Sequence, residues 1–137
     1  MILEVEHLSF AYRPERPLFY DVSFAFEQGQ VLSILGANGA GKSTLLNCIA
    51  NLLLPQQGEI RLHGTPLSRL ELREISRIIG YVPQSHTPAY DYTVRDFVVM
   101  GRAPHLGTFQ QPGRADYDLV DATLEEMGLL PLANRPY

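Results

Sequence analysis

The sequence lacks several features that would mark a specialised class of protein. It holds a single cysteine, Cys48, in 137 residues, so no internal disulfide can form, which fits a reducing compartment. No stretch approaches the roughly 20 apolar residues that a membrane-spanning helix requires. The N-terminal residues 1–6 have neither the basic start nor the long apolar run of a signal peptide. We therefore expect a cytoplasmic protein.

Basic runs, internal repeats and low-complexity tracts are also missing. Lysine and arginine are scattered, and the formal net charge is −4, so we expect no nucleic-acid partner. Hydrophobic residues make up 45% and charged residues 19%, which is the balance of a folded domain and argues against disorder.

Apolar periodicity predicts a mixed α/β chain that becomes helical after residue 84. The turn at residues 13–17 contains two prolines, and Thr93 to Asp96 resembles a capping box before a helix. We divide the chain into residues 1–84, an α/β core, and residues 85–137, a helical part. The expected strands are residues 2–8, 19–26, 30–35, 58–64 and 78–82, and the expected helices are residues 43–50, 70–76, 93–100 and 117–127.

The residues 36–44, GANGAGKST, fit the phosphate-loop pattern G-x-x-x-x-G-K-[ST] in full, between a predicted strand and a predicted helix. Glycines let the main chain wrap tightly and point several N–H groups inward, and the helix N-terminus adds partial positive charge. Lys42 brings an ammonium to the β- and γ-phosphates, and the Ser43 hydroxyl can hold Mg²⁺. A plain glycine turn does not explain a lysine followed by two hydroxyl residues, so we predict phosphate binding.

Four stretches in this order resemble the ATP-binding subunit of ABC transporters. They are residues 8–30 (LSFAYRPERPLFYDVSFAFEQGQ), 36–44, 52–64 (LLLPQQGEIRLHG) and 78–84 (IIGYVPQ). The resemblance implies a phosphate-loop NTPase fold of the ABC ATPase type, with an antiparallel β-subdomain and part of a helical subdomain.

The resemblance also assigns site residues, with ATP and Mg²⁺ as the bound species. Tyr12 lies where the family stacks an aromatic ring on adenine, and Gln84 lies where the family has a glutamine that contacts Mg²⁺ and water. Lys42 and Gln84 are implied in catalysis, and Ser43 and Gln84 in metal binding. The residues implied in nucleotide binding are Tyr12, Gly36, Asn38, Gly39, Ala40, Gly41, Lys42, Ser43 and Thr44.

Residues 92–109 (YTVRDFVVMGRAPHLGTF) resemble the subgroup that imports iron–siderophores, haem, cobalamin and related metal chelates or oxyanions. This implies that residues 85–137 face transmembrane permease subunits. It also implies that the whole protein pairs with a second copy and lies peripherally on the inner face of the cell membrane.

Other motifs of the family are not found in the sequence. It has no serine-glycine signature loop, no apolar strand followed by Asp-Glu, and no later histidine for the γ-phosphate. We therefore expect the chain to be an N-terminal portion that binds ATP but hydrolyses it very slowly or not at all by itself.

Two alternatives are of other kinds. A small kinase or GTPase would also carry the phosphate loop, but no Asn-Lys-x-Asp motif and no Arg-rich lid is present. A non-catalytic nucleotide-binding module, or a soluble ABC protein with no permease, is the other alternative; a permease gene beside the coding sequence would favour transport, and a second ATPase cassette in the same reading frame would favour the soluble class. Among the remaining residues, we expect Cys48 to be a small buried hydrophobe, His7 to be structural, His86 to be exposed, and Arg95 and Arg102 to be exposed helix charges or permease contacts.

Overall fold

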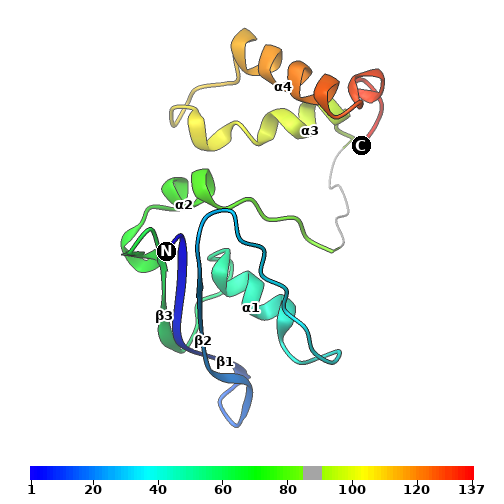
Figure 1. Cartoon of the computed structure of the whole chain (residues 1–137). Helices are drawn as coiled ribbons and strands as arrows, with labels where there is room; N and C mark the ends of the chain where they lie inside the picture. Colours follow the sequence, from blue (N-terminus) through cyan, green and yellow to red (C-terminus); the bar gives the residue numbers. More distant parts are fainter. Residues whose placement is uncertain (85–90) are drawn as a thin grey trace. The chain divides into compact units, whose positions relative to one another are not determined.

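The computed structural model describes residues 1–84 and 91–137, which form two compact units, Met1–Tyr81 and Val82–Tyr137 (Figure 1). Each unit is described by itself, because their positions relative to one another are not determined. The roles assigned above to residues 1–84 and 85–137 stay predictions, and His86 lies outside the described residues.

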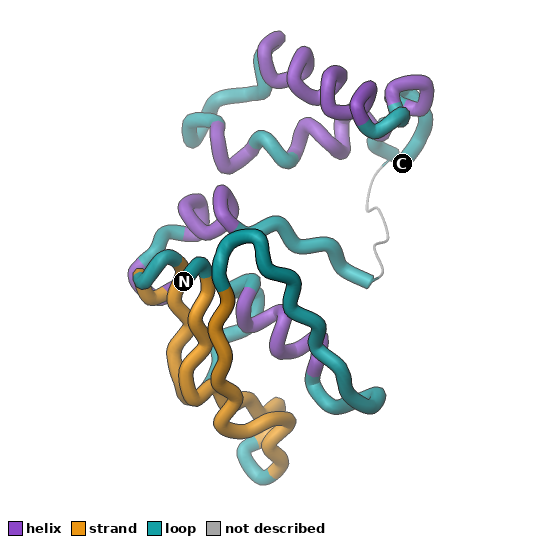
Figure 2. The backbone as a smooth tube through the Cα atoms, viewed as in Figure 1, coloured by secondary structure: helices purple, strands orange, loops and turns teal. Residues whose placement is uncertain are grey.

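The first unit is built on an antiparallel sheet of order β2-β1-β3-β4 (Figure 2). Its strands are β1 (Leu3–Arg13), β2 (Arg16–Phe26), β3 (Gln57–Leu62) and β4 (Thr65–Pro66). The turn predicted at residues 13–17 is confirmed at its centre, where Pro14 and Glu15 link β1 to β2, whereas Arg13 belongs to β1 and Pro17 to β2. The strands predicted at residues 2–8, 19–26 and 58–64 are present, and β1 and β2 extend further than the sequence pattern indicated.

The core of this unit lies between the sheet and helix α1 (Lys42–Ile49), which contributes Leu45 and Cys48. Cys48 is 1% exposed, and burial raises the pKa of its thiol, so the prediction of a small buried hydrophobe is confirmed. Leu52 lies three residues beyond the end of this helix at Ile49 and is 60% exposed.

An irregularity in β1 changes which residues face the core. Leu3 and Val5 are buried before it, and Leu8 and Phe10 after it. His7 lies between them with φ of 51°, and its Nδ1 is 2.6 Å from Oδ1 of Asp21, which also has positive φ. The structural role predicted for His7 is confirmed, because this contact joins β1 to β2 at the bulge.

Two predicted strands are wrong. Residues 30–35 belong to no strand, with Val31 94% and Leu35 90% exposed, and residues 79–83 follow the end of helix α2 (Leu72–Ile78) without strand pairing. Both runs are apolar and short, the pattern of a fully buried parallel strand. Pairing also requires a neighbouring strand, and the described sheet places none beside either run.

The second unit consists of helices. They are α3 (Val94–Met100), α4 (Arg114–Glu126) and the short 3₁₀ turns η2 (Ala103–His105) and η3 (Leu130–Leu132); a further turn, η1 (Leu67–Arg69), lies in the first unit. The core of the second unit is Val99, Val120, Leu124 and Ala133. The helices predicted near residues 70–76, 93–100 and 117–127 correspond to α2, α3 and α4.

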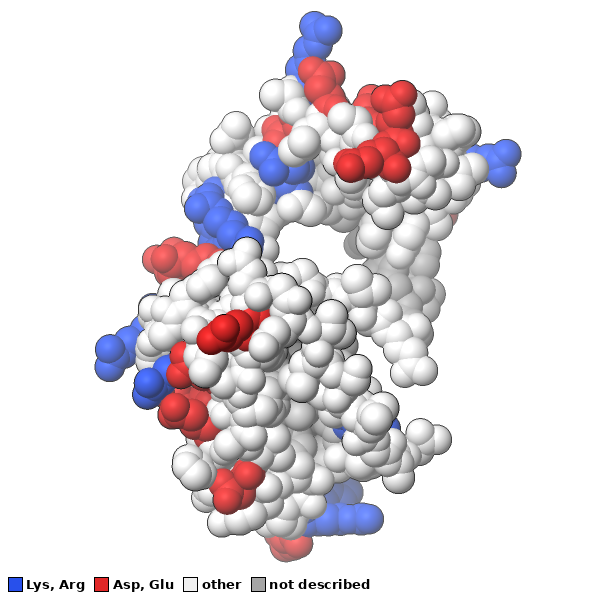
Figure 3. Space-filling view, in the orientation of Figure 1, with Lys and Arg blue, Asp and Glu red and all other residues white. Residues whose placement is uncertain are grey.

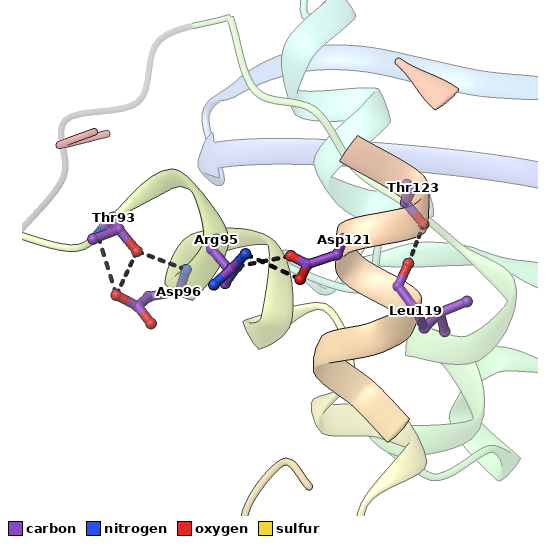
Figure 4. Close-up of polar contacts among 6 residues, drawn as sticks. All are labelled: Thr93, Arg95, Asp96, Leu119, Asp121 and Thr123. Atoms are coloured by element: carbon purple, nitrogen blue, oxygen red, sulfur yellow. Dashed lines mark hydrogen bonds and ion pairs between the residues drawn. The ribbon is translucent and has the colours of Figure 1, made fainter. Parts of the chain in front are cut away.

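The start of α3 carries the predicted capping box. Thr93 Oγ1 accepts from the N–H of Asp96 (3.1 Å), and the Asp96 carboxylate accepts from the N–H of Thr93 (3.3 Å) (Figure 4). Arg95 forms a bidentate ion pair with Asp121 on α4, in which Nε and Nη2 donate to the two carboxylate oxygens at 2.7 and 3.0 Å. Arg102 pairs with Asp116 at 2.9 Å. Neither arginine is therefore a plain solvated charge, because Arg95 holds α3 against α4, and Arg102 holds the start of η2 against α4.

The Asp116 carboxylate accepts two hydrogen bonds in the second unit. The Arg102 guanidinium and the N–H of Gly113 donate to it, and both lower the pKa of Asp116 below its ordinary value. A carboxyl whose folded pKa is depressed stabilises the fold above its unfolded pKa of about 3.9 and loses that contribution as pH falls through the folded value.

We therefore expect Asp116→Asn to flatten the acid side of the stability curve. The free energy of unfolding of the parent, measured by urea titration, should fall more steeply below about pH 4 than that of the variant. Asp118→Asn is the control, since Asp118 is on the same helix but its side chain is 70% exposed and lies 4.0 Å from Arg114. Equal acid slopes for Asp116→Asn and the parent would contradict this account.

The surface in view mixes acidic and basic side chains, and no broad basic field covers that face (Figure 3). In residues 1–84 and 91–137, no helix is both long enough and apolar enough to cross a membrane.

Candidate nucleotide-binding site

The glycine loop (residues 36–41) connects the extended run at residues 30–35 to α1. Gly41 is the N-cap of α1, with φ of 90°, a conformation that residues with a side chain rarely adopt. A Cβ at Gly41 would come within 3.0 Å of Leu18 and Phe19 on β2, so glycine also allows the loop to approach the sheet. The loop is therefore fixed between the sheet and the helix it opens.

Lys42 is the first residue of α1, and its ammonium folds back over the loop. Nζ donates to the carbonyl oxygens of Gly36 and Ala37, each at 2.8 Å. These bonds draw the loop into a curl with the positive charge against it. An oxyanion bound inside this curl would contact the same ammonium. It would replace the two carbonyl oxygens as the acceptor of the hydrogen bonds from Lys42.

The first turn of α1 offers amide donors on the same side. Leu45 donates to Gly41 (2.8 Å), whereas the N–H groups of Lys42, Ser43 and Thr44 make no backbone hydrogen bond among the described residues, as expected for a first helical turn. Together with the helix dipole, they favour an anion at this end of the helix. The exposed Ser43 hydroxyl is an oxygen ligand of the kind that Mg²⁺ takes beside phosphates.

Tyr12 lies close to this turn although it comes from β1. Its hydroxyl is 3.2 Å from Oγ1 of the buried Thr44, and its ring makes an edge contact with Phe10 at 4.9 Å between centroids. Tyr12 is still 67% exposed, so much of its surface is open to a ligand. An open pocket of about 360 Å³ lies beside it, lined in part by Pro17, Phe19 and Tyr20.

Four predicted residues remain. Asn38, Gly39 and Ala40 lie in the glycine loop and are exposed. Gln84 is exposed and belongs to the second unit, whose position relative to the loop is not determined, so its contact with Mg²⁺ stays a prediction. Within the described ranges, no cluster of three His, Cys, Asp or Glu side chains could hold a metal ion.

Sequence reasoning missed two links to the site. One is the hydrogen bond of Tyr12 to Thr44, and the other is a pair of hydrogen bonds from the side chain of Gln56 to Ala11, the neighbour of Tyr12. The partners are 32 and 45 residues apart, so no local pattern could have revealed them.

The chain is similar to known proteins over nearly its whole length. The family model described as ABC transporter matches residues 19–137. The molybdate import ATP-binding protein MolC of Haemophilus influenzae is 37% identical over 135 residues, which are 98% of this chain and 48% of that protein. The hemin import ATP-binding protein HmuV of Nocardia farcinica is 37% identical over 126 residues, 90% of this chain and 42% of that protein.

A solved structure of the ATP-binding subunit of an ABC transporter superposes with a TM-score of 0.79 at 25% identity, over 99% of this chain and 54% of that one. The chain spans about half the length of the curated relatives it matches.

Proposed function

The chain belongs to the ABC transporter ATP-binding family, and from that premise we propose that it binds Mg-ATP at residues 36–44 with the adenine on Tyr12. The observation that carries the proposal is the Lys42 ammonium held in the curl of the glycine loop by Gly36 and Ala37 at the start of α1. An ammonium, a helix N-terminus and adjacent main-chain amides form a site for a polyanion.

Each part of ATP has a counterpart in the first unit. The β- and γ-phosphates would take the amides of residues 42–44 and the ammonium of Lys42, which leaves the two loop carbonyls. The hydroxyl of Ser43 would hold Mg²⁺, which neutralises charge on the phosphates when bound. The exposed ring of Tyr12 would take the adenine ring, by analogy with bases that stack on aromatic side chains.

For the whole protein we propose a role in import, driven by ATP binding and hydrolysis. The relatives from Haemophilus influenzae and Nocardia farcinica are named for the import of molybdate and haem. We infer a metal chelate or a related oxyanion as the transported substrate. The protein would act with transmembrane permease subunits and a second ATP-binding subunit, on the inner face of the membrane, with Gln84 sensing Mg²⁺ and water.

The chain of 137 residues itself would bind ATP without measurable turnover. Residues 36–44 and Tyr12 grip the nucleotide, but hydrolysis also needs a group that orients water and groups that stabilise charge on the γ-phosphoryl. The sequence has no Asp-Glu pair after an apolar strand, so it lacks the glutamate that would act on the attacking water as a general base.

Titration calorimetry with three ligands tests the binding proposal. Mg-ATP and Mg-tripolyphosphate should both bind, with ATP tighter by roughly 1–3 kcal/mol from stacking, and adenosine alone should bind at least about 100-fold more weakly than ATP. Phosphate release should not exceed that of a Lys42→Ala variant. Adenosine binding as tightly as ATP, or no binding of tripolyphosphate, would sink the proposal.

A further inference from the structure

The side chain of Gln56 acts as an extra peptide group at the end of the sheet. Its Oε1 accepts from the N–H of Ala11 (2.7 Å), and its Nε2 donates to the C=O of Ala11 (2.5 Å). The main-chain N–H of Gln56 donates to Ser9 (3.1 Å). The carboxamide thus continues the pairing of β1 with β3 beyond its last residue pair, Ser9 with Gln57.

This pairing fixes β1 at a place where the sheet is otherwise irregular. The register between β1 and β2 shifts on both sides of Ala11, and the β2 residue opposite Ala11 is Pro17, which has no N–H to donate. β3 begins at Gln57, so no main-chain group of that strand lies opposite Ala11. Gln56 therefore supplies both hydrogen bonds on this edge of β1.

Tyr12 follows Ala11 directly, and its own contacts are few. Its hydroxyl is 3.2 Å from Thr44, its ring touches Phe10 by an edge, and its side chain is 67% exposed. A ring with so much exposed surface depends on its main chain for its orientation. The pocket of about 360 Å³ beside Tyr12 is also lined by Gln56, so the Gln56 side chain and the Tyr12 ring border the same space.

We propose that Gln56 is a positioning residue for the adenine ring: by clamping the main chain of Ala11, it holds Tyr12 at the angle that a stacked base requires. This rests on the proposed function, in which Tyr12 carries adenine. Gln56 does not contact the phosphates in this account. It contributes to the affinity for a nucleotide and not to the affinity for a bare polyphosphate.

The test compares Mg-ATP with Mg-tripolyphosphate, which has no base, in the full chain. Gln56→Met keeps the length of the side chain but removes both hydrogen bonds, and Gln56→Ala removes the side chain. Both should weaken ATP binding roughly fivefold to tenfold, a loss no larger than that caused by Tyr12→Ala. The affinity for tripolyphosphate should stay within about twofold of the parent. Gln28→Ala, at an exposed glutamine of the same unit that does not line this pocket, should match the parent for both ligands.

The outcomes separate the two proposals. Equal losses for ATP and tripolyphosphate would show a general disturbance of the fold and overturn the positioning role, as would unchanged ATP affinity in Gln56→Met. Failure of the unmodified chain to bind either ligand would overturn the proposed function itself. Tyrosine-ring NMR signals of the ligand-free chain give a second readout, in which Gln56→Met should shift the Tyr12 ring and Gln28→Ala should not.

Discussion

Replacing Gly58 with alanine should destabilise the first unit by about 3–5 kcal/mol, a large share of the stability of a domain of this size. Gly58 lies in β3 opposite the bulge of β1, with φ of 87°. A Cβ there would lie 2.4 Å from the carbonyl oxygen of Glu6 and 2.5 Å from that of His7. Both are main-chain atoms in the middle of the sheet, so they cannot move aside as a flexible side chain would.

Gly64→Ala provides the matched control for this substitution. Gly64 also has positive φ, 77°, but a Cβ there would meet nothing within 4 Å. It should therefore cost only the conformational penalty of about 1–2 kcal/mol. Urea unfolding of the two variants, followed by far-ultraviolet circular dichroism, separates the steric cost from the conformational one. Similar losses for both would mean that β1 shifts to accommodate the methyl group.

The sequence predicted best the features that depend on neighbours along the chain. The hairpin at Pro14, the helix after Gly41 and the capping box of Thr93 and Asp96 are all local, and the structure has them. The apolar runs at residues 30–35 and 78–82 misled the prediction because composition reports only that a segment suits burial. Whether it pairs depends on a strand elsewhere, and Val31 and Val82 are more than nine-tenths exposed.

The same distinction holds for the site. The phosphate-loop pattern located Lys42 and the N-terminus of α1 because the fold of that segment follows from its own glycines. Contacts from Tyr12 to Thr44 and from Gln56 to Ala11 depend on how β1 lies against α1 and β3. The arrangement of the loop around Lys42 was therefore predictable from sequence, and the contacts that support Tyr12 were not.

Lys42→Ala should abolish most of the affinity for both Mg-ATP and Mg-tripolyphosphate, by about 100-fold or more. A charge-assisted hydrogen bond contributes about 1.5–3 kcal/mol, and 100-fold corresponds to about 2.7 kcal/mol. The variant also loses the two bonds that curl the glycine loop, to Gly36 and Ala37, so the amides of the loop should be less well arranged for phosphate. Calorimetry with both ligands measures the loss, which should be equal for the two because Lys42 does not reach the base.

Lys42 is the only lysine in the sequence, which allows the same claim to be tested without changing the protein. An amine-reactive reagent can modify only Lys42 and the N-terminal amine, and mass spectrometry of peptides distinguishes them. Saturating Mg-ATP or Mg-tripolyphosphate should slow modification of Lys42 by about the bound-to-free ratio and leave the N-terminus unchanged, because a bound phosphate takes the ammonium as its partner. Adenosine should give no protection. Equal labelling of Lys42 with and without saturating triphosphate would mean that its ammonium stays on the loop carbonyls, and the phosphate site would have to lie elsewhere.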